Sequence, residues 1–274
     1  MSSTTELTHD PDDRRPSVAE LRRVGQPDQI RQRRNAEHWT ADVYGRRISP
    51  YLTLVALRLG MSANQVTWLM LAIGWVAALA VALPGWGFAV LAVALAHLQM
   101  LVDSSDGELA RWKRTTGPVG IFIDKLAHYT TEALIALALG VRAAGGFGEI
   151  PDNLAWTTLG GLFATLLLLN KVVNDLVVSS RAQGGLPPAK DAAEVAAPRV
   201  GGVARLRRAA RFVPFHRLFH AVELATVIAV AAIADAFLGG DDVTRWTLVG
   251  LIVAVVVTGA GHLVAILTSS RLRA

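Results

Sequence analysis

The sequence has no cysteine among its 274 residues, which excludes disulfide bonds and metal sites built on thiolates. Aromatic residues make up only 7% of the chain and charged residues 18%, whereas 52% are hydrophobic. The first 50 residues contain no long apolar run, and the run that follows is too long for a secretory signal and has no small-residue cleavage site. We therefore expect no signal peptide and a chain whose apolar segments stay within a membrane.

The apolar residues gather in segments close to the ~20 residues that a membrane-spanning helix needs. The third to fifth segments are polar at one end, so hydropathy alone ranks them below the others. We predict an all-α integral membrane protein with six transmembrane helices and an N-terminal interfacial amphipathic helix. The predicted spans are residues 65–83, 86–102, 121–141, 154–178, 218–238 and 246–267.

Basic residues are distributed unevenly between these spans. Of 27 Lys and Arg, against 22 Asp and Glu, most precede the first span, follow the second and fourth, or end the chain. The alternate loops hold little beyond Arg142 and Arg245. The positive-inside rule therefore predicts a multi-pass protein of the inner (cytoplasmic) membrane, with both termini and the loop after the second span in the cytoplasm. This charge balance favours the anionic lipid of the bilayer and phosphate as partners, and no nucleic acid.

Composition divides the chain into three predicted regions. Residues 1–35 are rich in Pro, Asp, Arg and Ser, which predicts a disordered cytoplasmic tail. Residues 36–60 mix apolar and basic residues, which predicts a juxtamembrane amphipathic helix broken near Pro50. Residues 61–274 form the predicted six-helix membrane domain, in which residues 184–212 are expected to be a flexible basic connector.

A set of acidic and small residues stands where the second apolar run meets a polar loop. If that run continues as a helix, Asp103, Asp106 and Gly107 share one face with two residues at offsets of seven and eight. Gly117 and Pro118 then break the helix, and a second stripe repeats at intervals of four on the next one. The first stripe is Asp103, Asp106, Gly107, Ala110 and Arg111, and the second is Gly120, Asp124 and His128.

Two stripes joined by a short turn can face each other. Carboxylates that converge from two helices repel one another unless a cation lies between them, and acids at membrane depth are costly and usually functional. Hard oxygen ligands of this kind suit magnesium or manganese. A divalent metal site is therefore predicted at this point of the chain.

The spacing D-x2-D-G-x2-A-R-x8-G-x3-D resembles the signature of the CDP-alcohol phosphotransferase family, integral membrane enzymes that make phospholipid head groups. The family pattern ends with one more aspartate, where this chain has His128, so seven of eight positions match. The resemblance covers residues 60–135. It implies transfer of a substituted phosphate from a CDP-linked alcohol to an acceptor hydroxyl with release of CMP, two Mg²⁺ or Mn²⁺ ions, and a homodimer. The donor is CDP-diacylglycerol or a CDP-activated polar alcohol.

The resemblance also implies a role for each matched residue. The metal ligands are Asp103, Asp106 and Asp124, with His128 at the fourth position. The small residues let the nucleotide approach the helix backbone closely. Arg111 pairs either with a phosphate or with a signature carboxylate.

Asn64 and Thr67 resemble a further element of the family, with Ala63 in place of its proline. Their alternative role is a helix cap. The predicted nucleotide-binding set is Asn64, Thr67, Asp103, Gly107, Ala110, Arg111 and Gly120.

His128 departs from the family pattern in a chemically competent way. A neutral imidazole accepts a proton or binds a metal ion, and its reference pKa of about 6.5, against about 3.9 for aspartate, makes it the stronger base. We predict that His128 is the catalytic base as well as a metal ligand, with Glu132 one turn further orienting its ring. The alternative is an inactive member that has a weakened or lost second metal site.

Polar residues near the ends of later spans are candidates for acceptor binding. Lys171 and Arg217, the latter next to His216, are predicted to bind an acceptor phosphate. The alternatives are snorkelling to lipid headgroups or a pair between Lys171 and Asp175. No role is predicted for the isolated His97, Asp235 and His262.

Two other function classes use the same residues. A transporter would hold ions on the intramembrane carboxylates and give flux without CMP. A non-catalytic scaffold would bind nucleotide without dependence on a divalent metal. The acids cluster at one face of the membrane and no inverted repeat of broken helices is evident, which favours the transferase.

Overall fold

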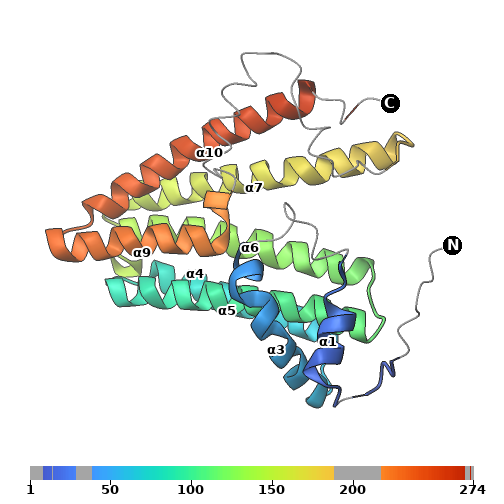
Figure 1. Ribbon diagram of the computed structural model, residues 1–274. Helices are drawn as coiled ribbons and strands as arrows, with labels where there is room; N and C mark the ends of the chain where they lie inside the picture. The colour runs from blue at the N-terminus through green and yellow to red at the C-terminus, as the bar shows by residue number, and fades with distance from the viewer. Residues whose placement is uncertain (1–8, 14, 29–38, 188–216, 269–271, 273–274) are drawn as a thin grey trace. The chain divides into compact units, whose positions relative to one another are not determined.

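The computed structural model describes residues 9–13, 15–28, 39–187, 217–268 and 272, and all regular secondary structure in these ranges is helical (Figure 1). The chain divides into two compact units, Met1–Val76 with Ala94–His128, and Ala77–Val93 with Tyr129–Ala274. The long helices α4 (Ala63–Ala82), α5 (Trp86–Trp112) and α6 (Pro118–Ala143) each contribute residues to both units.

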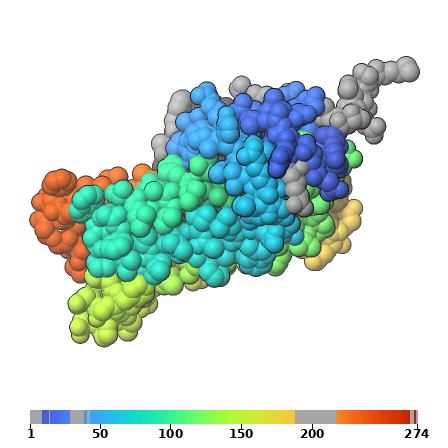
Figure 2. Space-filling model, turned by 90° about the horizontal axis from the view of Figure 1, so that it is seen from below, coloured from blue at the N-terminus to red at the C-terminus, as the bar shows by residue number. Residues whose placement is uncertain are grey.

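Among the described residues, five helices are long and apolar enough to cross a membrane, which confirms an all-helical multi-pass membrane protein. They are α4, α5, α7 (Leu154–Gln183), α9 (Ala221–Leu238) and α10 (Asp242–Thr268). Their outward side chains include large apolar groups, as expected of a lipid-facing surface, and Figure 2 shows atoms of α4 and α5, in cyan to blue-green, at the surface. Exposed examples on these two helices are Trp68, Trp75, Leu79, Trp86 and Phe88.

The count of six spans is not confirmed. The predicted third span coincides with α6, which is a helix of 26 residues. It carries Asp124, Lys125, Glu132 and Arg142, and these charges keep it outside the set of sufficiently apolar helices. Its crossing of the membrane stays a prediction.

Helix α1 (Val18–Gly25) lies inside the segment predicted to be disordered, which corrects that prediction for these residues. It begins with a capping box, because Ser17 Oγ accepts from the Glu20 backbone N–H while the Glu20 carboxylate accepts from the Ser17 backbone N–H at 2.9 Å. These hydrogen bonds lower the pKa of Glu20. Leu21 is fully buried, so the helix is also held by tertiary packing. The other parts of the predicted tail, 1–8, 14 and 29–35, lie outside the described residues.

Helix α3 (Arg46–Arg58) follows directly on a π-helical turn, η1 (Ala41–Gly45). The predicted break near Pro50 is wrong, because Pro50 lies inside α3. Proline lacks the N–H of one intrahelical hydrogen bond, and α3 continues past it to Arg58. The placement of α3 at a membrane interface stays a prediction.

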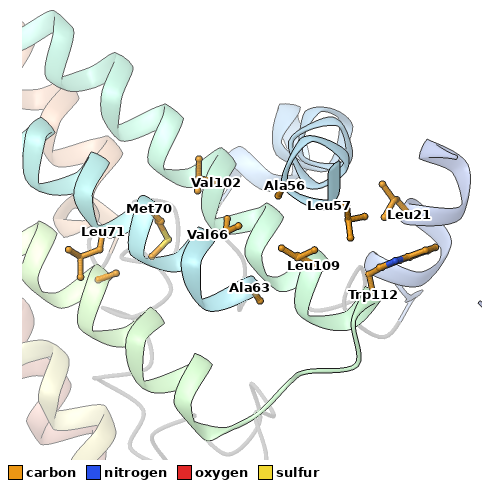
Figure 3. Close-up of a cluster of buried hydrophobic side chains, with 11 residues drawn as sticks. Leu21, Ala56, Leu57, Ala63, Val66, Met70, Leu71, Val102, Leu109 and Trp112 are labelled. Atoms are coloured by element: carbon orange, nitrogen blue, oxygen red, sulfur yellow. The ribbon is translucent and has the colours of Figure 1, made fainter. Parts of the chain in front are cut away.

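The core of the first unit joins α1, α3, α4, α5 and α6 (Figure 3). Leu21 and Trp112 lie together at one end of the cluster, near Leu57. Val66 and Leu109 occupy its middle. The end of α5, which carries the signature, is therefore packed on several helices.

The second unit is built by close helix approaches. Helix α10 packs against both α7 and α9, and η3 (Arg217–Phe219) leads into α9. Gly140 of α6 and Gly160 of α7 touch so closely that a Cβ on Gly140 would lie 2.6 Å from the Cα of Gly160. Small residues of this kind let helices pack in a membrane, where lipid leaves little hydrophobic drive between them.

Three charged residues in the second unit complete backbone hydrogen bonds at helix ends. Arg142 donates to the carbonyls of Leu83 and Gly85, just past the end of α4. Arg245 donates to the carbonyl of Ala143 at 3.0 Å. Asp235, for which no role was predicted, accepts from the first N–H groups of α10 at 2.8 and 2.9 Å.

Candidate metal centre

The signature residues are presented by two consecutive helices, as the spacing predicted. Helix α5 continues beyond the apolar run to Trp112. It ends in a Schellman motif, in which Thr115 N–H donates to the Ala110 carbonyl at 2.9 Å and Arg114 takes a left-handed φ of 54°. Helix α6 then begins at Pro118, whose missing N–H costs nothing at a first helical position. Gly117 and Pro118 were predicted to end the first signature helix. In the structure α5 already ends at Trp112, and Pro118 is the first residue of α6.

Asp103, Asp124 and His128 converge between these helices. The Nε2 atom of His128 lies 3.2 Å from Asp103 Oδ1 and 3.5 Å from Asp124 Oδ1. One potential ligand atom from each residue lies within 4.8 Å of the others. The side chains of His128 and Asp103 are 25% and 24% exposed, so the cluster is open to an incoming ion or substrate. The arrangement offers two hard oxygens and one imidazole nitrogen to a single cation.

Asp106 is not a member of this three-residue set. It lies one turn beyond Asp103, close enough to interact with it electrostatically, and its carboxylate lies beside the Thr67 hydroxyl. Its Oδ2 atom is buried and has no hydrogen-bond partner within the described residues. A buried carboxylate oxygen without a partner costs free energy, which a bound cation nearby would offset. The donor set and this oxygen together fit a divalent metal ion.

Asn64 and Thr67 lie against the signature helices. A Cβ on Gly120 would lie 3.6 Å from Asn64 Oδ1, so the amide faces the start of α6. The cap at the start of α4 is supplied by Ser62 and Gln65, since each side chain accepts from the other's backbone N–H, at 3.3 and 2.8 Å. The alternative role of Asn64 and Thr67 as a cap is therefore taken by other residues.

Arg111 ties the signature to the N-terminal helix. Its Nε donates to the Gly25 carbonyl at 2.5 Å, and its guanidinium lies over Gly107, where a Cβ would come within 3.1 Å of Nη1. Gly107 thus gives room to a side chain of the protein itself. Ala110 packs at the edge of the hydrophobic core. Nucleotide binding by these residues stays a prediction.

Lys171 belongs to a polar cluster of the second unit. Glu132 is 1% exposed and forms an ion pair with Lys171, and the Nδ1 atom of His220 lies 3.3 Å from its carboxylate. The Lys171 ammonium also lies 5.9 Å from the ring centre of Tyr129, whose hydroxyl donates to Asp175 at 2.9 Å.

Arg217 is half-buried in η3, and the neighbouring His216 lies outside the described residues. His262, for which no role was predicted, lies 3.2 Å from the Asn170 amide oxygen.

Sequence reasoning missed Glu108, which lies between signature positions and is 2% exposed. Its carboxylate accepts from Ser49 at 2.5 Å, from Thr53 at 2.7 Å and from Gln26 at 2.7 Å. A buried glutamate with three donors joins α3 and the end of α1 to α5. His97, for which no role was predicted, is not isolated, because its Nδ1 lies 2.5 Å from the Tyr44 hydroxyl.

Residues 60–258 match the family model for CDP-alcohol phosphatidyltransferase. The chain belongs to this family. Members of the CDP-alcohol phosphatidyltransferase family transfer phosphatidyl groups from a CDP-alcohol and generally use divalent metal ions, which agrees with the Asp103, Asp124 and His128 set. The match reaches far beyond the signature, because it contains the whole of α4, α5, α6, α7 and α9 and part of α10. No curated protein matches the chain.

Proposed function

We propose that this protein transfers a phosphatidyl or similar substituted phosphate group from a CDP-linked alcohol to the hydroxyl of an acceptor alcohol. The acceptor oxygen forms a bond to the phosphorus next to the transferred group, the bond from that phosphorus to the CMP oxygen breaks, and CMP leaves with the bonding electrons. The proton of the acceptor hydroxyl passes to a basic group of the protein. The observation that carries the proposal is the convergence of Asp103, Asp124 and His128 in a member of this family.

Different residues of the site are proposed to bind the metal ions, bind the nucleotide and accept the proton. Asp103, Asp124 and His128, with Asp106 one turn away, would hold one or two divalent ions, which when bound neutralise the pyrophosphate and the charge that develops on CMP. Asn64 and Thr67 support nucleotide binding from α4, because they face Gly120 and Asp106. His128 is the candidate proton acceptor, since its ring edge is directed at the two carboxylates that would stabilise an imidazolium.

The second unit supplies the candidate acceptor site. Lys171 is held by the buried Glu132 and the ring of Tyr129, so its ammonium has a defined position. Arg217 and Lys171 are proposed to receive an acceptor phosphate. The further parts of the proposal are a cytoplasmic membrane location, with both termini and the metal centre on the cytoplasmic side, and a homodimer.

The decisive experiment incubates purified full-length protein in lipid nanodiscs with labelled CDP-diacylglycerol or CDP-activated polar alcohols. Magnesium or manganese and a mixture of polyols, phosphorylated polyols and amino alcohols are added, and products are identified by mass. We expect CMP and one new phosphodiester in equal amounts. If no donor releases CMP with any acceptor, the transferase proposal is wrong, and a transporter would give ion flux once the same protein is reconstituted in sealed vesicles.

A further inference from the structure

His128 directs a specific nitrogen atom at the two carboxylates. Its Nε2 lies 3.2 Å from Asp103 Oδ1 and 3.5 Å from Asp124 Oδ1, so the same ring edge faces one carboxylate from α5 and one from α6. A cation held by these two oxygens would lie within reach of Nε2. The imidazole is therefore placed in the ligand set and not at its margin.

The donor set differs from an all-carboxylate site in its preference among metals. Magnesium keeps oxygen ligands and loses water reluctantly, whereas imidazole nitrogen suits the first-row transition metals. The order of affinity for nitrogen-containing sites rises from manganese towards copper. Replacement of one carboxylate by imidazole also lowers the negative charge of the site, which weakens the purely electrostatic attraction on which magnesium depends.

We propose that His128 Nε2 is a metal ligand and that this chain binds a transition-metal ion such as Mn²⁺ in preference to Mg²⁺. The inference rests on the proposed function for its site and goes beyond it in the identity of the ion. This role replaces that of proton acceptor in the proposed function, because a nitrogen that holds a metal ion cannot accept a proton at the same time. The proton of the acceptor hydroxyl then passes to another basic group of the site.

The test uses tag-free, full-length protein, so that no added histidine contributes a signal. Mn²⁺ binding is followed by electron paramagnetic resonance, and the echo modulation from directly bound ¹⁴N is recorded for the wild type, His128→Asp and His128→Ala. His262→Gln is the matched control, because His262 lies on α10, where its Nδ1 is 3.2 Å from the Asn170 amide oxygen. Competition by Mg²⁺ against bound Mn²⁺ is measured in each protein.

We expect ¹⁴N modulation in the wild type and in His262→Gln, and none in either His128 variant. In His128→Asp the ratio of Mg²⁺ affinity to Mn²⁺ affinity should be about tenfold or more higher than in the wild type, because the site then consists of oxygen ligands alone. Equal modulation in wild type and His128→Asp, or an unchanged Mg²⁺ to Mn²⁺ preference, would overturn the inference.

Failure of the inference can be told apart from failure of the proposed function. Protein that releases CMP with Mg²⁺ but shows no ¹⁴N modulation from bound Mn²⁺ is a transferase in which His128 is not a ligand. Protein that binds no Mn²⁺ and releases no CMP contradicts both. In the first case His128→Ala should lower the rate of CMP release while the affinity for Mn²⁺ stays that of the wild type, as expected of a base.

Discussion

The Nε2 atom of His128 on α6 lies 3.2 Å from Oδ1 of Asp103 on α5, although the two residues are 25 positions apart. The contact crosses the turn between the two signature helices, and Asp124 joins it from the preceding turn of α6 at 3.5 Å. The substitution that separates this chain from the family pattern thus lies within the cluster. The residue is placed to act in the reaction as a ligand or as a base.

Removal of either convergent carboxylate should abolish most of the activity. Asp103→Asn and Asp124→Asn keep side-chain size but remove a negative charge from the cluster, so CMP release should fall by about 10²-fold or more. Initial rates of CMP release in nanodiscs measure the effect. Asp152→Asn is the matched control, because Asp152 is exposed in the turn before α7 and should retain the wild-type rate.

Replacement of His128 tests whether this protein is an active member of the family that uses His128 in its site. His128→Ala should lower CMP release by about 10²-fold or more, because the cluster loses a ligand or a base. His128→Asp should retain more activity, since aspartate stands at this position in the family pattern. Equal rates for the wild type and both variants would remove His128 from the site.

The buried carboxylate of Glu108 should stabilise the first unit. Glu108→Ala leaves the buried Ser49 hydroxyl without its acceptor, which costs about 1–3 kcal/mol, whereas Thr53 and Gln26 each keep a second acceptor in the Ser49 and Arg46 carbonyls. The thermal midpoint should fall, and α1 should become more sensitive to limited proteolysis. Glu149→Ala, on an exposed glutamate in η2 (Phe147–Glu149), should change neither measurement.

The contact between Gly140 and Gly160 should tolerate no side chain. Gly140→Ala would bring a methyl group to 2.6 Å from the Gly160 Cα and 2.7 Å from the Trp156 carbonyl oxygen, and backbone atoms cannot move aside as a flexible side chain can. We expect a loss of about 1–3 kcal/mol in the free energy of unfolding, seen as a lower thermal midpoint. Gly161→Ala is the matched control, because nothing lies within 4 Å of a Cβ there, and it should be neutral or stabilising.

The local patterns predicted the helices well and their polar ends less well. The observed spans begin and end within a few residues of the predicted apolar runs wherever those runs are uninterrupted, as in α4 and α9. Helix α1 was missed because its eight residues have no long apolar run, and what holds it in place includes contacts with α5. The Glu108 cluster was missed because its partners lie 55, 59 and 82 positions away, where no periodicity connects them.

The sequence by itself determined the order of the helices, the membrane character of the chain and the spacing that puts each stripe of signature residues on one helix face. These properties follow from hydrophobic runs and helix-ending residues, which act over one or two turns. Only the tertiary structure decided that Asp103, Asp124 and His128 meet while Asp106 lies beside Thr67, and that Arg111 reaches Gly25. Distances between side chains of different helices depend on how closely those helices pack, and buried glycines and polar contacts remote in sequence set that packing.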